Sequence, residues 1–341
     1  MSAASSPSTL GATRTRSALP PLTTLEDIQA ARAALPDCVR LTPVLPVSRD
    51  SAEIDRERLF VKAESLQITG AYKIRAAFNV LRLLDDAQRK RGVVMTSSGN
   101  FAQAFAFAGR KLGVPVVVVM LEQTSAYKVE MTRGHGAEVV FCGNDAGQRQ
   151  PTVERIAAER GMLALDTWEE QPIPAGHGTI GLEILEQCPQ VEQVLVPTSS
   201  GGLIAGIAAA IKLTRPEVSV IGVQPVRANA AWRSLEAGQP VEIDDWDSIA
   251  DGLSARRPGA YPFAHLQAFV DRIVLVEERD IGRAFETLLY RAKLLSEPAG
   301  AVATAAFLAG KVDQARNTVA LLSGGNLTTQ AMDALFALAR Q

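Results

Sequence analysis

The chain reads Glu64-Ser-Leu-Gln-Ile-Thr-Gly-Ala-Tyr-Lys-Ile-Arg-Ala-Ala-Phe-Asn79, and Lys73 stands where turn-forming residues give way to an apolar helical pattern. An amine at a helix N-terminus, among apolar side chains, is poorly stabilised as an ammonium ion. Its pKa falls, and the neutral amine can then form a Schiff base with a carbonyl compound. A lysine taken alone is more often a solvated surface residue, so the rest of the chain must decide between these roles.

Three other segments consist of a strand, a turn of small residues and a helix. Such turns direct backbone N–H groups and a helix N-terminus toward one point, which is how a phosphate or a carboxylate is held. One turn of this kind is common in α/β proteins, but three of them together with Lys73 indicate a site for an anionic ligand. The turns are Thr96–Asn100 after Val93–Met95, Pro197–Gly202 after Val194–Val196, and Ser323–Asn326 after Thr318–Leu322.

These motifs carry a resemblance to one enzyme family. The chain resembles the fold-type-II pyridoxal-phosphate enzymes, in the branch of threonine/serine dehydratases and serine racemase, from about Thr24 to the C-terminus. The family's Gly-Ser-Phe-Lys-x-Arg-Gly-Ala motif corresponds to Gly70–Ala77, and its Ser-x-Gly-Asn-His loop corresponds to Ser97–Phe101. The further matches are Ala175–Thr179, Ser199–Gly202, Ala250–Leu253, Glu297–Ala301 and Leu322–Asn326.

The alternation of strands and helices predicts an α/β fold with parallel sheets covered on both faces. The resemblance implies a tryptophan-synthase-β-like fold, with two parallel-sheet α/β domains and pyridoxal 5′-phosphate in the cleft between them. We expect a flexible tail over 1–22, a large domain from 23–91 plus 170–341, and a small domain over 92–169. The composition of the tail is also typical of a transit peptide. The predicted strands are Val93–Met95, Val116–Met120, Val139–Phe141, Val194–Val196, Val218–Val223, Ile273–Val276 and Thr318–Leu322.

The overall composition excludes several classes of partner. With 35 basic and 37 acidic residues, the chain has no charge excess that would favour nucleic acid or a membrane surface. Its scattered cysteines fit a reducing compartment, so we expect a cytoplasmic protein, and the resemblance implies a homodimer. A lone histidine is usually a structural residue with its hydrogen bonds satisfied, and we interpret all three in this way. The cysteines are Cys38, Cys142 and Cys188, and the histidines are His135, His177 and His265.

The resemblance assigns cofactor contacts to several residues. Lys73 would form the Schiff base and then take the Cα proton of the substrate. Asn100 would bind the 3′-oxygen of the ring, and Tyr72 would pack against the ring, although a core aromatic is an equally good interpretation. Ser323 would face the pyridine nitrogen, where a hydroxyl keeps the ring a moderate electron sink and favours β-elimination. The phosphate would be bound by Ser199, Ser200, Gly201 and Gly202, the first two standing where the family has glycines.

The substrate carboxylate is expected at the turn that opens the helix after Val93–Met95. The resemblance also gives Ser98 a second role, as a group that exchanges the Cα proton in racemisation. Arg149 stands where the racemase has a carboxylate-contacting arginine, but its polar neighbours are more typical of a solvated side chain. Phe101 replaces the family's histidine and could line a pocket for a larger side chain, such as the phenyl ring of 3-phenylserine. The expected substrate-binding residues are Ser97, Ser98, Gly99, Asn100, Phe101 and Arg149.

We therefore predict an ammonia-lyase that dehydrates an L-3-hydroxy amino acid, with threonine, serine and a bulkier analogue such as phenylserine as candidates. The small-molecule product would be a 2-oxo acid. A racemase, or a β-replacement transferase on the same fold, is the alternative. The family often has an acidic cation site after a Gly-Val-Glu-Pro strand, but here the strand reads Gly222-Val-Gln-Pro225. Hard cations prefer carboxylates, so we predict no metal site of that type.

Overall fold

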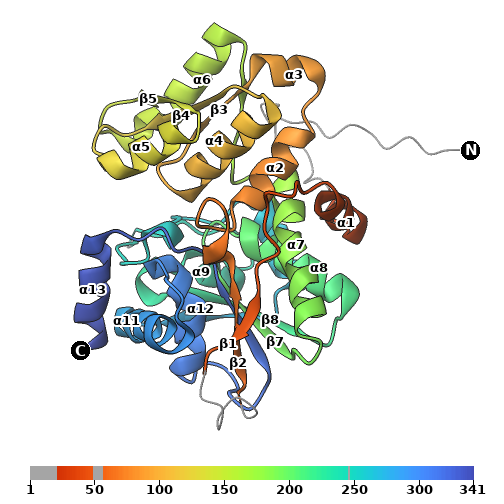
Figure 1. The fold of residues 1–341 in the computed structure, drawn as a ribbon, viewed down its shortest axis with the longest axis vertical. Coiled ribbons are helices and arrows are strands. Elements are labelled where there is room, and N and C mark those ends of the chain that lie inside the picture. Colours follow the sequence, from red (N-terminus) through yellow and green to blue (C-terminus); the bar gives the residue numbers. More distant parts are fainter. Residues whose placement is uncertain (1–20, 49–56, 245) are drawn as a thin grey trace, which may run out of the picture.

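Apolar strands alternate with helices along the chain. The strands form two β-sheets, and helices cover both faces of each sheet (Figure 1). The computed structural model describes residues 21–48, 57–244 and 246–341. Most of the predicted tail therefore lies outside the described residues. Its last two residues are described, and the hydroxyl of Tyr261 donates a hydrogen bond of 3.1 Å to the carbonyl of Pro21.

The larger sheet has six strands, and all of them except the first run parallel to one another. The first strand pairs antiparallel with the second. In spatial order the strands are β1 (Val44–Pro46), β2 (Leu59–Ala63), β10 (Thr318–Leu322), β7 (Gln193–Pro197), β8 (Ser219–Pro225) and β9 (Arg272–Val276).

The smaller sheet has four parallel strands, which lie in the upper body of Figure 1. All of them come from the sequence interval predicted as the small domain. In spatial order they are β5 (Glu138–Phe141), β4 (Val116–Met120), β3 (Val93–Thr96) and β6 (Leu163–Ala164).

The helices follow the strands in the order expected of an α/β protein. The first begins at a capping box in which Thr24 and Asp27 exchange hydrogen bonds. The α-helices are α1 (Leu25–Ala33), α2 (Ile74–Arg82), α3 (Asp86–Arg91), α4 (Asn100–Leu112), α5 (Ala126–Gly134), α6 (Arg149–Arg160), α7 (Pro172–Gln187), α8 (Gly202–Thr214), α9 (Ala230–Ala237), α10 (Ala260–Phe269), α11 (Glu278–Thr287), α12 (Pro298–Leu308) and α13 (Thr329–Ala339).

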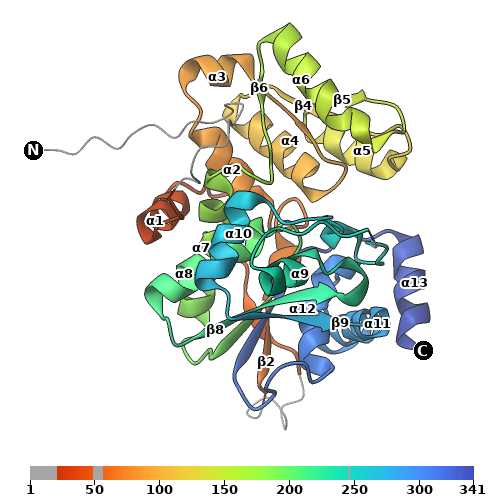
Figure 2. The same cartoon turned by 180° about the vertical axis from the view of Figure 1, so that it is seen from behind.

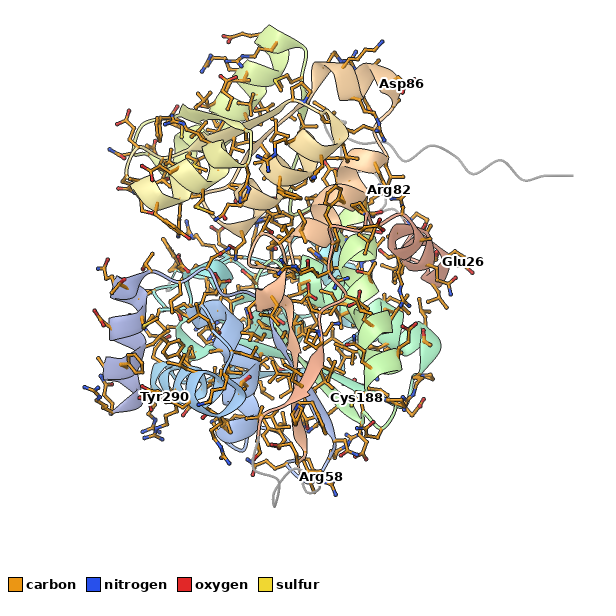
Figure 3. The ribbon with its side chains drawn as sticks, viewed as in Figure 1. Glu26, Arg58, Arg82, Asp86, Cys188 and Tyr290 are labelled. Carbon is orange, nitrogen blue, oxygen red and sulfur yellow. The ribbon has the colours of Figure 1, made fainter. Side chains whose placement is uncertain are left out.

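Each strand of the larger sheet sends alternate side chains to opposite faces, and a separate apolar core forms on each. In β10, Val319 and Leu321 belong to the core shared with α7 and α8, whereas Ala320 and Leu322 belong to the core shared with α11 and α12. α7 and α8 lie side by side along one face (Figures 1 and 2). Side chains fill the space between sheet and helices (Figure 3), and Cys188, labelled there, is 1% exposed.

The fold confirms the predicted α/β class, and all seven predicted strands are present with ends within two residues of those expected. Three strands were not predicted: β1, β2 and β6. The apolar run that would predict β2 is interrupted by Lys62. This charged side chain is fully buried here, where its amine is paired with the carboxylate of Glu183 at 2.6 Å. Along the described chain, no helix is both long and apolar enough to cross a membrane.

Candidate active site

Lys73 lies directly before α2, at the end of a loop that is fixed against the C-terminal end of β10. The N–H of Tyr72 donates to the carbonyl of Ser323 at 3.1 Å, and the N–H of Gly325 donates to the carbonyl of Gly70 at 2.9 Å. The carboxyl ends of parallel strands are where ligands bind in α/β folds. The predicted Schiff-base lysine and the predicted partner of the pyridine nitrogen are therefore neighbours in the fold.

The amine of Lys73 lies among aromatic rings. Its Nζ is 4.0 Å from the ring centroid of Phe101 and 4.5 Å from that of Tyr72. Loss of hydration lowers the pKa of Lys73 from 10.5 to about 7, although the carboxyl of Glu297 acts in the opposite direction. Near neutral pH, part of the amine is thus unprotonated and can act as a nucleophile or a base.

Asn100, the first residue of α4, belongs to a hydrogen-bond chain that joins the two sheets. Its Nδ2 donates to Oε1 of Glu297 at 2.8 Å, and its Oδ1 accepts from Nδ2 of Asn326 at 2.8 Å. Burial, and then repulsion from Asp251, raise the pKa of Glu297 to about 7. Sequence analysis missed Glu297 as a site residue, because a carboxylate before Pro298 at the start of α12 is typical of a helix terminus.

The predicted phosphate loop connects β7 to α8. Gly201 has a φ of 102°, in the region that favours glycine, and the following residues begin the helix. Ser199 and Ser200 are not among the described residues with positive φ, so their backbone accepts a Cβ. The N–H groups of 202–204 precede the first intrahelical bond, from Ala205 to Gly201, and are the donors that a helix N-terminus offers to an anion.

A second helix N-terminus, that of α4, follows the predicted carboxylate turn. The N–H of Gly99 donates to Oγ of Ser97 at 3.3 Å, and the hydroxyl of Thr124 donates to Oγ of Ser98 at 3.3 Å. Phe101 stands in the first turn of this helix and contacts Lys73, as described above. Arg149 begins α6 and is half-buried, and no described hydrogen bond, ion pair or ring contact joins it to the other candidate residues.

His177 does not fit its interpretation as a satisfied structural residue. It is fully buried in α7, and neither of its ring nitrogens has a hydrogen-bond partner among the described residues. Its ring centroid lies 4.8 Å from that of Tyr72 and 6.1 Å from that of Phe101. That interpretation is wrong for His177, because it predicts bonded nitrogens.

The same interpretation is confirmed for His265. Its Nε2 accepts from the N–H of Thr23 at 2.9 Å, and its Nδ1 lies 2.9 Å from the carbonyl of Tyr261. The two histidines therefore differ in kind, although nothing in their local sequence distinguishes them.

Residues 35–324 match the family described as "Pyridoxal-phosphate dependent enzyme". This chain belongs to that family. The site supplies groups that suit pyridoxal phosphate: an amine of lowered pKa at Lys73, a hydroxyl at Ser323, a helix N-terminus at α8, and a buried imidazole at His177 whose nitrogens lack partners in the described chain. Lys73 would carry the cofactor, and the 199–202 loop would hold its phosphate.

Relatives of the enzyme share most of its length. It is 36% identical over 310 residues to a catabolic L-threonine dehydratase of Staphylococcus aureus (strain N315), an alignment that covers 90% of each chain. The solved T.th. threonine deaminase aligns with a TM-score of 0.83 at 36% identity, over 90% of this chain and 99% of that one. Maize serine racemase aligns with a TM-score of 0.85 at 30% identity, over 93% and 99%. The predicted family branch is thereby confirmed.

The strand after which we predict no cation site is β8. Both polar atoms of the Gln224 side chain are used within the protein: Nε2 donates to the carbonyl of Thr198 at 3.2 Å, and Oε1 accepts from the N–H of Trp232 at 2.8 Å. In the described part of the chain, no group of three His, Cys, Asp or Glu side chains could hold a metal ion. The predicted lack of a metal requirement remains a prediction.

Proposed function

We propose that this enzyme dehydrates and deaminates an L-3-hydroxy amino acid to a 2-oxo acid and ammonia. One observation carries the proposal: the amine of Lys73, with a pKa of about 7, lies 4.0 Å from the ring of Phe101 in the first turn of α4. A base and an anion-binding helix N-terminus thus converge, as a reaction at the Cα of an amino acid requires. The similarity to threonine dehydratases supports the same reaction.

Each residue of the site has a role in this proposal. Bound pyridoxal phosphate supplies the electron sink that makes the Cα proton of the substrate acidic. Lys73 would take that proton, and the hydroxyl would leave from Cβ, so that one water is lost in total. Addition of water to the released enamine would then give the 2-oxo acid and ammonia. Asn100 would hydrogen-bond the 3′-oxygen of the cofactor ring, Tyr72 would pack on the ring, and the hydroxyl of Ser323 would interact with the ring nitrogen. The turn of residues 97–100 binds the substrate carboxylate.

The side chain of the preferred substrate depends on Phe101. Its ring lies 5.7 Å from that of Phe105 and borders the amine of Lys73, so it offers an apolar surface next to the reacting centre. We propose that this surface favours phenylserine over threonine and serine.

The test measures 2-oxo acid and ammonia release from protein loaded with pyridoxal phosphate, using L-threonine, L-serine and L-threo-3-phenylserine. Lys73→Ala should abolish release, whereas Lys90→Ala, at an exposed lysine of α3, should leave it unchanged. Absence of ammonia release from all three substrates by the loaded wild-type protein would exclude the dehydratase proposal.

Racemisation is a second candidate function, because the hydroxyl of Ser98, in the turn before α4, accepts a hydrogen bond from Thr124 and because maize serine racemase is similar. Exchange of the Cα proton of L-serine with deuterated solvent, followed by chiral chromatography, would detect it. Ser98→Ala should stop D-serine formation while leaving ammonia release measurable. If sulfide and an activated serine gave cysteine instead, a β-replacement transferase would be indicated.

We also propose that the enzyme is a cytoplasmic homodimer. All three cysteines are free in the structure, as a reducing compartment allows. Burial raises the pKa of Cys188 to about 11, so its thiol is unreactive near neutral pH. Light scattering on the loaded protein would give its oligomeric state.

A further inference from the structure

His177 is a buried polar side chain that lacks a partner where one is expected. Burying an imidazole without hydrogen bonds is unfavourable, because both ring nitrogens lose water and gain nothing. Its exposed fraction is 0%, and neither nitrogen has a partner among the described residues. A bound ligand could supply the hydrogen-bond partner that the ring nitrogens lack.

A close approach of two helices places the ring of His177 next to the site. A Cβ added at the neighbouring Gly176 would lie 2.7 Å from Cα of Ala76, so a glycine there lets α7 approach α2 closely. α2 is the helix that begins directly after Lys73. The imidazole therefore lies near both the ring of Tyr72 and that of Phe101, the second residue of α4.

The charge state of His177 limits what it can bind. Burial, and then repulsion by the cations of Lys73 and Arg75, hold its pKa well below 6.5, so the ring is neutral near pH 7. A neutral imidazole has one N–H donor and one acceptor nitrogen. The charged and titratable groups that contact or repel it are Lys73, Arg75 and the phenol of Tyr72, whose pKa is raised by burial. None of them is an anion. An N–H donor that lies beside a cation can donate a hydrogen bond to a carboxylate, whose negative charge the cation also attracts.

We propose that His177 donates a hydrogen bond to the carboxylate of the amino-acid substrate, which the N-terminus of α4 holds from the other side. The proposal rests on the proposed function for the substrate class. In this chain the carboxylate-binding imidazole would then come from α7. It would lie beside Phe101 of α4, the apolar residue that replaces the family's histidine.

The test compares three variants with the wild-type protein. His177→Leu removes the donor, and His177→Gln keeps one. His265→Leu is the matched control, since His265 is also buried but is bonded to Thr23 and Tyr261. Binding is followed on protein loaded with pyridoxal phosphate, as the absorbance change on titration with L-alanine or with L-alaninol, which has the same amine but no carboxylate. The apo-proteins are also compared, by their Tm and by their Kd for pyridoxal phosphate.

For His177→Leu we expect the Kd of L-alanine to rise roughly tenfold to a hundredfold, the range expected for one hydrogen bond to a charged group. The Kd of L-alaninol and the Kd of pyridoxal phosphate should change by less than about twofold. His177→Gln should recover most of the L-alanine affinity. The Tm of the apo-protein should be unchanged or higher in His177→Leu, because an unsatisfied polar group has been removed, but lower in His265→Leu.

Any of three binding results for His177→Leu would overturn the proposal: an unchanged Kd for L-alanine, an equal loss of affinity for L-alanine and L-alaninol, or a weaker Kd for pyridoxal phosphate. A fall in the Tm of apo His177→Leu as large as that of His265→Leu would also overturn it, since it would show a structural imidazole. L-Alanine has no β-hydroxyl, so the titration reports carboxylate binding even if the enzyme releases no ammonia from any hydroxy amino acid.

Discussion

The side-chain amide of Asn100 donates a hydrogen bond of 2.8 Å to Oε1 of Glu297, although 197 residues separate them. Asn100 follows β3, a strand of the smaller sheet, and Glu297 precedes α12, which packs on the larger sheet. This bond therefore connects the two parts of the molecule. The carboxyl of Glu297 titrates near pH 7, in the range where the enzyme is expected to work.

Asn100→Ala should destabilise the protein more at pH 8 than at pH 5. The pKa of Glu297 is raised by folding from 4.5 to about 7, so the stability it contributes is present below pH 4.5 and is lost as the pH rises through 7. The Asn100 bond lowers that pKa and limits the loss. Its removal should cost about 1–3 kcal/mol at pH 8 and little at pH 5, by urea unfolding of the apo-protein.

In a Glu297→Gln background, the same Asn100→Ala change should have equal effects at both pH values, because no charge remains at position 297. A cost for Asn100→Ala that is independent of pH in the presence of Glu297 would contradict the proposed coupling.

The rate at which the apo-protein captures pyridoxal phosphate should rise with pH, with a midpoint near pH 7. Burial lowers the pKa of Lys73 from 10.5 to about 7, and only the neutral amine attacks the aldehyde. Stopped-flow absorbance would give the profile, with free Nα-acetyl-lysine as the reference. Glu297→Gln should move the midpoint to lower pH, since Glu297 raises the pKa of Lys73. A midpoint near 10 would show a solvated lysine.

Arg75→Met should destabilise the enzyme by about 3–5 kcal/mol, because it leaves the buried carboxylate of Glu64 without its ion-pair partner and Glu183 with Lys62 alone. The guanidinium of Arg75 is fully buried and contacts Glu183 at 2.6 Å and Glu64 at 2.8 Å. These ion pairs fix the start of α2, and with it Lys73, against α7. The measurement is the free energy of unfolding of the apo-protein in urea.

Arg155→Met provides the matched control, since Arg155 pairs with Glu159 at 2.9 Å on the exposed face of α6. Its loss should cost less than about 1 kcal/mol. If the two arginine variants were equally stable, the buried network would not hold α2 in place.

Phe101→His should lower kcat/KM for phenylserine relative to threonine by roughly tenfold, the discrimination that a modest change of apolar surface supplies. Phe101→Leu keeps the surface apolar and should retain the wild-type preference. Steady-state kinetics with both substrates would measure the ratio. An unchanged ratio in Phe101→His would assign Phe101 to packing against Phe105 alone.

The sequence by itself determined the family, the cofactor, the α/β class and the position of Lys73 at the start of a helix. These depend on local features: apolar runs such as 318–322 that form buried strands, and small residues such as those of 199–202 that form turns. Strand period and turn chemistry act over a few residues and can be recognised in the chain.

The tertiary structure alone decided which distant groups meet. It placed Glu297 against Asn100, buried Arg75 between Glu64 and Glu183, and left the nitrogens of His177 without partners in the described chain. His177 and His265 are both isolated histidines in the sequence, yet their bonding differs. The reason is physical: whether a buried polar group finds a partner depends on the packing of helices far apart in sequence, which no local pattern encodes.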